Sequence, residues 1–222
     1  MKSIQSFLSK AGLQLYYNTH EKTRVYSFDF NMEEKKMSRV CVFLADGFEE
    51  VEALTVVDLL RRAEINVTMV SVSDSLQVRG RSNIEVIADE LWDNAKPAKS
   101  DMLILPGGMP GVTYLEEHEG LRDLLVKFAE EGKEVAAICA APTILGKLGI
   151  LKGKKATVYP GAEVMLKGAD VVLDKEVVTD GNITTSRGAG TAIPFALRLI
   201  EILSGAEMAD KIGKQTVYYC TE

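Results

Sequence analysis

Short apolar runs that alternate with longer amphipathic stretches are the feature that most restricts the fold of this chain. The runs are rich in Val, Ile and Leu, as in strands buried on both faces of a parallel sheet. The predicted strands are 40–45, 66–72, 101–105, 135–139 and 182–186, with shorter extended pieces at 77–88, 155–158, 171–173 and 176–178. The predicted helices are 49–62, a long stretch ending at 131, a helix ending at 148, and 191–203. This order predicts an α/β domain whose mostly parallel central sheet is covered by helices on both faces, with functional residues at the carboxyl ends of the strands.

Composition limits the number of domains and the class of partner. The chain has 222 residues, 46% of them hydrophobic, which is enough for one substantial core. Its net charge of −6 argues against nonspecific nucleic-acid binding, which requires a basic surface. No apolar run approaches the length of a membrane span, so we expect no membrane partner.

The cysteines and histidines point to a reducing compartment and to no metal site. Cys41, Cys139 and Cys220 are far apart and form no CxxC pair, and no signal peptide precedes them. Scattered cysteines in odd number are typical of cytoplasmic proteins, so we expect a cytoplasmic location. His20 and His118 have no partner at metal-ligand spacing, and we expect His118 to be exposed to solvent.

Residues 1–37 differ from the rest of the chain, and two explanations for them stay open. They are rich in Tyr, Phe, Lys and Ser and lack the apolar segment of a secretion signal. Residues 33–37 can be encoded by a purine-rich stretch before an ATG, in which case Met37 is the natural start. The alternative is an N-terminal arm with a strand near 24–30. In both cases we expect residues 1–37 to be an extension, disordered or upstream of the true start, and the α/β domain to cover 38–222.

Cys139 ends the apolar run that begins at Glu134, and small residues and Pro142 follow it. This pattern predicts a strand-to-helix elbow with a thiol at its tip, a nucleophile elbow. The N–H groups and the positive dipole end of the following helix favour the thiolate, which is the reactive form. The alternative is a free cysteine buried as a small hydrophobic residue, which is common.

Glu52 lies near the start of the first predicted helix, in an acidic segment. Acidic residues often cluster there because they offset the helix dipole, and this suffices to explain Glu49 and Glu50. Glu52 instead falls on the apolar stripe of the helix, between Phe48 and Val56. A carboxyl group on that face is costly to ionise, so its pKa should rise, and a protonated carboxyl can donate a hydrogen bond to a thiolate or transfer a proton.

Two glycines end the strand at 101–105. Adjacent glycines such as Gly107 and Gly108 let the backbone approach a ligand and point N–H groups at a developing oxyanion, although Pro-Gly-Gly is also ordinary turn chemistry. The N–H groups of Gly108 and Ala140 are the candidates for an oxyanion hole. The later glycine-rich segment 186–191 lacks the spacing and the lysine of a phosphate-binding P-loop, so we expect a helix entry with Thr191 near the cap.

Four short motifs occur along the chain in order: Leu44-Ala-Asp-Gly-Phe-Glu-Glu-Val-Glu52, Leu105-Pro-Gly-Gly108, Ala136-Ala-Ile-Cys-Ala-Ala-Pro142 and Thr185-Ser-Arg-Gly-Ala-Gly-Thr191. Together they resemble the ThiJ/PfpI superfamily, in particular the subgroup of the parkinsonism-associated protein deglycase, over about residues 39–219. The resemblance implies a flavodoxin-like three-layer α/β/α sandwich related to class I glutamine amidotransferases, a homodimer, and activity without a cofactor. By position, Cys139 matches the reactive cysteine, Glu52 the carboxyl group that contacts it, and Gly108 and Ala140 the backbone donors.

Two residues depart from the family pattern. Protease-like and larger chaperone-like members have a histidine directly after the cysteine, where this chain has Ala140, which argues against a peptidase. Some members of the nearer subgroup have a histidine where this chain has Tyr159. Because tyrosine, with a pKa of about 10, is a poor base at neutral pH, we expect slow activity if that position assists proton transfer.

The resemblance implies two functions, between which the sequence does not decide. The first is glyoxalase III or deglycase chemistry on methylglyoxal, glyoxal or their early adducts, with the Cys139 thiolate as nucleophile and Glu52 as proton shuttle. The second is a redox-sensing stress protein or chaperone whose Cys139 is oxidised to a sulfinate held by protonated Glu52. Gly107 and Tyr159 are expected to line the site. Arg62 is a further candidate near a subunit boundary, although a solvated helix end explains it equally well.

Overall fold

The structure is a computed structural model that describes residues 14–15, 26–27 and 37–219. The chain divides into two units, Met1–Lys36 and Met37–Glu222. In the first unit, strands β1 (Gln14–Leu15) and β2 (Tyr26–Ser27) pair antiparallel. The predicted strand near 24–30 overlaps β2, and the remaining residues of that stretch lie outside the described residues.

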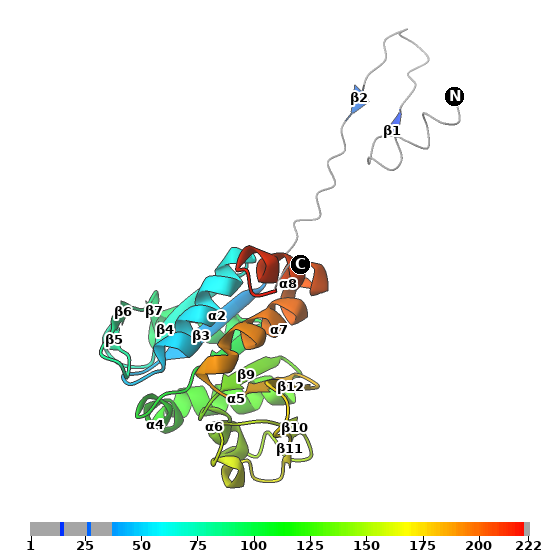
Figure 1. Cartoon of the computed structure of the whole chain (residues 1–222). Coiled ribbons are helices and arrows are strands. Elements are labelled where there is room, and N and C mark those ends of the chain that lie inside the picture. The colour runs from blue at the N-terminus through cyan, green and yellow to red at the C-terminus, as the bar shows by residue number, and fades with distance from the viewer. Residues whose placement is uncertain (1–13, 16–25, 28–36, 220–222) are drawn as a thin grey trace. The chain divides into compact units, whose positions relative to one another are not determined.

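A seven-stranded sheet forms the centre of the second unit (Figure 1). Its strands are β3 (Arg39–Leu44), β4 (Asn66–Ser71), β7 (Glu90–Leu91), β8 (Met102–Leu105), β9 (Glu134–Ile138), β12 (Val177–Asp180) and β13 (Ile183–Ser186). The order across the sheet is β12-β13-β9-β8-β3-β4-β7, and every neighbouring pair is parallel except β12 with β13. In register, Val42 of β3 lies opposite Met69 of β4 and Ile104 of β8. The mostly parallel sheet predicted from the apolar runs is confirmed.

Helices cover both faces of this sheet. One face carries α2 (Glu50–Arg62), α7 (Ala192–Ser204) and α8 (Ala206–Gln215), and the other carries α4 (Gly111–Glu117), α5 (Glu119–Glu130) and α6 (Pro142–Lys147). Alternation along β3 explains the two cores, because Val40 and Val42 contribute to the first and Cys41 and Phe43 to the second. The result is the flavodoxin-like three-layer α/β/α sandwich that the family resemblance implies.

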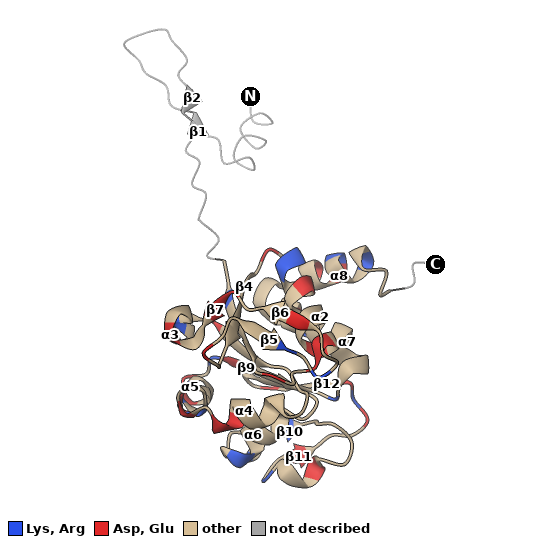
Figure 2. Cartoon of the chain, turned by 90° about the vertical axis from the view of Figure 1, so that its left-hand side faces the viewer, with Lys and Arg blue, Asp and Glu red and all other residues tan. Residues whose placement is uncertain are grey.

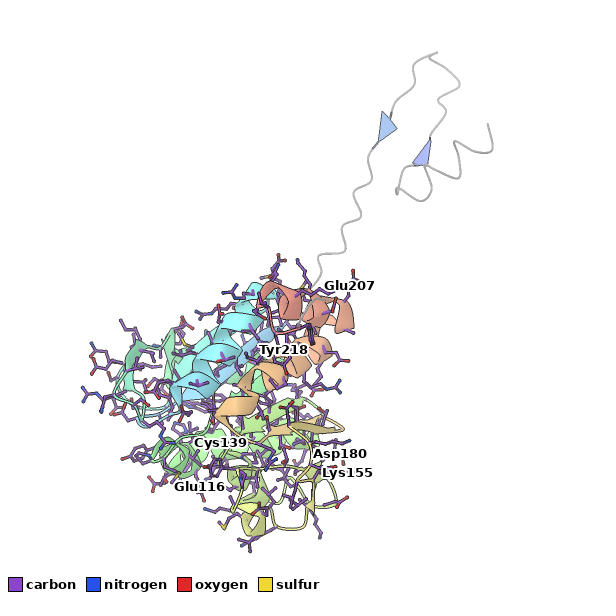
Figure 3. The ribbon with its side chains drawn as sticks, in the orientation of Figure 1. Glu116, Cys139, Lys155, Asp180, Glu207 and Tyr218 are labelled. Carbon is purple, nitrogen blue, oxygen red and sulfur yellow. The ribbon has the colours of Figure 1, made fainter. Side chains whose placement is uncertain are left out.

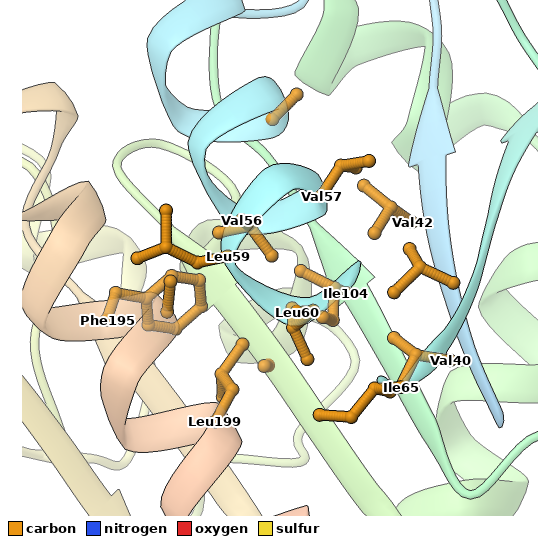
Figure 4. Close-up of a cluster of buried hydrophobic side chains, with 14 of the residues drawn as sticks. Val40, Val42, Val56, Val57, Leu59, Leu60, Ile65, Ile104, Phe195 and Leu199 are labelled. Carbon is orange, nitrogen blue, oxygen red and sulfur yellow. The ribbon is translucent and has the colours of Figure 1, made fainter. Parts of the chain in front are cut away.

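The core between the sheet and α2 and α7 is formed by interlocking aliphatic side chains (Figure 4). Leu60 of α2 and Phe195 and Leu199 of α7 are fully buried there, against strand residues such as Val42 and Ile104. Burial of each such side chain stabilises the fold by about 1.5–3 kcal/mol. This packing fixes the first turn of α2, which carries Glu52, relative to the strand ends.

The helix predicted to end at 131 is two helices, α4 and α5, that meet at His118. His118 has an extended backbone, and its Nδ1 atom accepts a hydrogen bond from the Leu121 N–H at 3.1 Å, which caps α5. The imidazole also packs against the Trp92 ring, with 4.5 Å between ring centroids. The prediction that His118 is exposed to solvent is therefore wrong: the side chain is half-buried and holds a helix start.

Smaller elements complete the second unit. They are the antiparallel hairpin β5 (Gln77–Arg79) and β6 (Glu85–Ile87), the parallel pair β10 (Lys155–Ala156) and β11 (Asp170–Val171), helix α3 (Trp92–Ala95), and the short 3-10 helices η1 (Pro97–Lys99), η2 (Glu163–Met165) and η3 (Ala189–Thr191). Helices α5 and α8 carry charges of both signs (Figure 2). Within the described parts of the chain, no helix has the length and hydrophobicity that a membrane span requires.

Candidate active site

Cys139 follows directly after β9 and has the left-handed backbone of a sharp turn, with φ of +64°. This conformation costs about 1–2 kcal/mol in a residue with a side chain. Two backbone hydrogen bonds hold it: the Cys139 N–H donates to the Ser186 carbonyl at 3.0 Å, and the Tyr159 N–H donates to the Cys139 carbonyl at 2.9 Å. The predicted strand-to-helix elbow with a thiol at its tip is therefore present, fixed from two other segments, and Figure 3 shows Cys139 near the first turn of α7.

Glu52 lies in the first turns of α2 and is almost completely buried, with 1% of its surface exposed. Its Oε2 atom accepts a hydrogen bond from the Gly107 N–H at 2.8 Å, and its carboxyl group shares a hydrogen bond with the Cys139 sulfur. Burial raises the pKa of Glu52 to about 7, against the lowering effect of these two hydrogen bonds. The expected rise in this pKa is thus found, and the carboxyl group lies beside the thiol.

Gly107 and Gly108 make the close approach of these groups sterically possible. A Cβ atom on Gly107 would lie 2.6 Å from both the Cys139 Cβ and the Glu52 Oε2. Gly108 has a φ of +94°, and a Cβ atom there would lie 2.4 Å from the backbone of Gly47. Any side chain at either position would therefore push the site apart.

The backbone N–H groups of Gly108 and Ala140 both hydrogen-bond to the Cys139 sulfur and lower the pKa of the thiol. Burial and the Glu52 carboxyl group act more strongly in the opposite direction and raise the pKa of Cys139 to about 12. The prediction that the elbow by itself gives a thiolate of low pKa is therefore wrong. Helix α6 has only six residues, and its N-terminus does not outweigh burial beside a carboxyl group.

Burial is the largest cause of the raised pKa values of both Cys139 and Glu52, and the Glu52 carboxyl group raises the pKa of Cys139 further. Two negative charges in contact at a buried position repel each other strongly, so both groups do not ionise together near neutral pH. Such a pair titrates as a unit, and over a wide pH range it holds one proton and one negative charge between the sulfur and the carboxyl group.

Tyr159 lies at the mouth of the site. Its side chain is 54% exposed, and a Cβ atom on Gly188 would lie 3.4 Å from the Tyr159 ring and 3.9 Å from the Cys139 sulfur. Sequence reasoning missed Gly188; its only signal was a glycine two residues after the end of β13. The loop that holds Gly188 is fixed by Thr191, whose Oγ1 accepts from the Gly188 N–H at 3.1 Å and lies 2.7 Å from the Ser186 Oγ. Thr191 is the N-cap residue of α7, as predicted.

Arg62 is not part of this cluster within the chain. It lies in the last turn of α2, and its Nε donates to Asp58 at 2.9 Å. At 1.5 Å per residue, about 15 Å of helix separate it from Glu52. Cys41 also lies outside this cluster. It is buried in β3, and its sulfur is 3.1 Å from the Ser100 hydroxyl oxygen. Among the described residues, no group of three His, Cys, Asp or Glu side chains is arranged to hold a metal ion.

Comparison with known proteins finds relatives over most of the chain. Residues 38–202 match the model of the DJ-1/PfpI family. Protein DJ-1 homolog B of Arabidopsis thaliana is 38% identical over 180 residues, which cover 81% of this chain but 41% of that protein, so the chain spans less than half of this relative. The Caenorhabditis elegans protein named glutathione-independent glyoxalase DJR-1.2 is 32% identical over 166 residues, covering 75% of this chain and 88% of that protein. The solved structure of oxidized Toxoplasma gondii DJ-1 matches with a TM-score of 0.78 at 37% identity, covering 83% of this chain and 100% of that one.

Proposed function

This chain belongs to the DJ-1/PfpI family, and from that premise we propose that it is a cysteine-dependent, cofactor-independent enzyme of the glyoxalase III or deglycase type. Its substrates would be methylglyoxal, glyoxal or their early adducts, and its role defence against carbonyl and oxidative stress. The observation that carries the proposal is the buried contact between the Cys139 sulfur and the Glu52 carboxyl group. The name of the nematode relative supports the same chemistry.

We place the single negative charge of the pair on sulfur and the proton on Glu52 in the resting enzyme, against the order of their separate pKa values, which are about 7 for Glu52 and about 12 for Cys139. Two N–H groups, those of Gly108 and Ala140, reach the sulfur, whereas the N–H of Gly107 reaches the carboxyl group. Hydrogen bonds to an ionised group stabilise it, so the balance of donors favours the thiolate. Intrinsic basicity favours the opposite assignment, because a carboxylate is a weaker base than a thiolate.

Each step of the reaction has a residue suited to it. The Cys139 thiolate attacks the aldehyde carbon of methylglyoxal and forms a carbon–sulfur bond, and the N–H groups of Gly108 and Ala140 stabilise the charge on oxygen. Glu52 gives its proton to the oxygen of the adduct, and the resulting carboxylate then moves a proton from that carbon to the neighbouring carbonyl carbon, which converts the hemithioacetal into a thioester of lactate. Water then breaks the carbon–sulfur bond and releases lactate. Atoms and electrons balance without an external oxidant, since one carbon is oxidised and its neighbour reduced.

Ala140 and Tyr159 limit which chemistry this site supports. Ala140 supplies no imidazole beside the sulfur, so a cysteine–histidine peptidase mechanism lacks its base. Tyr159 stands where some members of the nearer subgroup have a histidine, so proton transfer depends on Glu52. Slow turnover is the expected consequence.

A second candidate function is redox sensing through Cys139. Cys139 is only partly buried, so peroxide can reach it, and the matching Toxoplasma gondii structure is of an oxidized form. A Cys139 sulfinate would accept hydrogen bonds from Gly108, Ala140 and protonated Glu52. Peroxide titration followed by intact mass would support this role if Cys139 took up two oxygens and a partner protein then bound differently.

The deciding experiment is lactate formation from methylglyoxal in buffer free of amines and thiols. We expect Cys139→Ala to abolish it and Glu52→Gln to lower kcat at least about 100-fold, the usual scale of general acid–base catalysis. Cys220→Ser is the matched thiol control and should retain activity. Lactate formation by Cys139→Ala at the wild-type rate would refute the cysteine-dependent mechanism.

We also propose a homodimer, on the basis of family membership. Light scattering of the full chain should give twice the monomer mass of 24.3 kDa. A role of Arg62 at a site near the subunit boundary depends on that dimer. A monomer at micromolar concentration would refute both.

A further inference from the structure

The ring of Tyr159 and the sulfur of Cys139 face a shared space at the mouth of the site. Gly188 leaves this space open, because a side-chain carbon built on it would meet the Tyr159 ring at 3.4 Å and the sulfur at 3.9 Å. Both distances are ordinary van der Waals contacts. An atom of a molecule attached to the sulfur therefore has room to lie against the ring.

This part of the mouth is apolar. Gly188, which lies against both the Tyr159 ring and the Cys139 sulfur, offers no polar side chain, and neither does Ala140, which follows Cys139 in the chain. The nearest charged residues of the two loops, Glu163 and Arg187, attract each other: after the Gly161 N–H and the backbone of Glu163 itself, Arg187 helps to lower the pKa of the Glu163 carboxyl group. The flank therefore presents an aromatic face, with Arg187 and Glu163 as charged neighbours on the two loops.

The position of Tyr159 is fixed by its backbone. Its N–H donates to the Cys139 carbonyl at 2.9 Å, and its carbonyl accepts from the Ala162 N–H at 3.0 Å. Tyr159 thus stabilises the elbow through its backbone, while the residue itself is 54% exposed. A half-exposed aromatic ring gains by being covered with apolar surface.

We propose that Tyr159 is a specificity-determining residue whose ring packs against the substituent of a bound α-oxoaldehyde, so that the enzyme prefers aryl-substituted α-oxoaldehydes to methylglyoxal. This inference rests on the proposed function and names the substrate class of the same site. With phenylglyoxal the balance is the one already given: a carbon–sulfur bond forms at the aldehyde carbon, a proton moves to the neighbouring carbon, and water releases mandelate. The substituent itself does not react.

The first test is the ratio of kcat/KM for phenylglyoxal to kcat/KM for methylglyoxal. An aromatic contact is worth about 0.5–1.5 kcal/mol, so Tyr159→Ala should lower this ratio roughly two- to tenfold, while Tyr159→Phe should retain it. The intrinsic reactivity of the two aldehydes cancels between variants. Tyr114→Ala is the matched control, since Tyr114 is 46% exposed but lines another hollow with Ala45 and Ser73, and its ratio should equal that of the wild type.

The second test does not require turnover. Cys139 is alkylated with iodoacetanilide and with iodoacetamide, which differ by one phenyl ring, and the rates are followed on the Cys139 peptide by mass spectrometry. The rate ratio should fall in Tyr159→Ala by the same two- to tenfold and remain unchanged in Tyr159→Phe and Tyr114→Ala.

The two tests separate the two proposals. If the alkylation ratio depends on Tyr159 but neither aldehyde gives a Cys139-dependent product, the role of Tyr159 is supported and the enzyme function is refuted. Turnover with both ratios unaffected by Tyr159→Ala would support the enzyme function and overturn the role of Tyr159. Absence of both effects would overturn both.

Discussion

At the scale of single residues, the reactivity of Cys139 depends on where one proton lies. The paired site loses its first proton at a pKa of about 7, the value to which burial raises Glu52. With that charge on sulfur, the alkylation rate of Cys139 by iodoacetamide should rise as the pH passes about 7 and then level off. The urea-unfolded chain is the control, and its thiols should react with the ordinary pKa of about 8.5. A rate that rises only well above pH 9 would place the charge on Glu52 and the proton on sulfur.

Replacing Gly107 with alanine should lower both stability and Cys139 reactivity, although it adds only one methyl group. One added methyl group would lie 2.6 Å from both Cys139 and Glu52, so Gly107→Ala must displace a strand end or the elbow. We expect a loss of about 1–3 kcal/mol in the free energy of unfolding, measured by urea denaturation, together with lower Cys139 reactivity. Gly190→Ala is the control, because nothing lies within 4 Å of the added atom. Equal stability of the two variants would show that the strand end and the elbow accommodate the added methyl group without loss of stability.

At the scale of elements, His118 decides where α5 begins. His118→Ala removes the acceptor for the Leu121 N–H and should lower the free energy of unfolding by about 1 kcal/mol. His118→Asn keeps an acceptor at the cap but loses the contact with Trp92, so it should recover most of that loss. If Asn destabilises the protein as much as Ala in urea denaturation, the ring contact rather than the cap holds this helix start.

The elements that the sequence predicts well are those with strong apolar patterns. Strands β3, β4, β8 and β9 are nearly continuous buried apolar runs, and their short length and β-branched residues favour strands. Helix α8 was missed because only Ala209, Ile212 and Gly213 of its ten residues are buried, which leaves a weak stripe. The break at His118 was missed because a histidine cap depends on a tertiary neighbour, Trp92, that no local pattern announces.

The candidate site shows the same division. The burial of Glu52 follows from its place on an apolar stripe, and the elbow follows from the end of an apolar run at Cys139. The strength of the coupling between them was not predictable, because it depends on the missing side chain of Gly107 and on how closely α2 approaches β9. The sequence pattern suggested a low thiol pKa from the helix end, whereas burial beside a carboxyl group raises it.

At the scale of the whole molecule, the parallel sheet brings distant segments to one edge. β3, β8, β9 and β13 are neighbours with their carboxyl ends on the same side, so the segments after them supply the start of α2, the glycines, the elbow and the Gly188 loop. The strain and the desolvation at this edge are borne by the two cores beneath it, which explains how a fold can keep a carboxyl group buried beside a thiol.

This arrangement should make the stability of the whole domain fall as the pH rises toward neutral. In the native state the Cys139–Glu52 pair keeps both of its protons up to a pKa of about 7, whereas in the unfolded chain Glu52 releases its proton near 4.5, so the native state binds more protons between these values. The contribution is fully present below pH 4.5 and is lost as the pH passes about 7, a change of about 3 kcal/mol.

Other carboxyl groups titrate too, among them Glu134, whose pKa burial also raises, so the measurement is the difference between wild type and Glu52→Gln. In urea denaturation, the free energy of unfolding of the wild type relative to Glu52→Gln should fall by about 3 kcal/mol between pH 4 and pH 7. Parallel pH profiles of the two proteins would mean that the carboxyl group is ionised in the folded domain at the same pH as in the unfolded chain, and the proton assigned to Glu52 in the reaction would have to come from elsewhere.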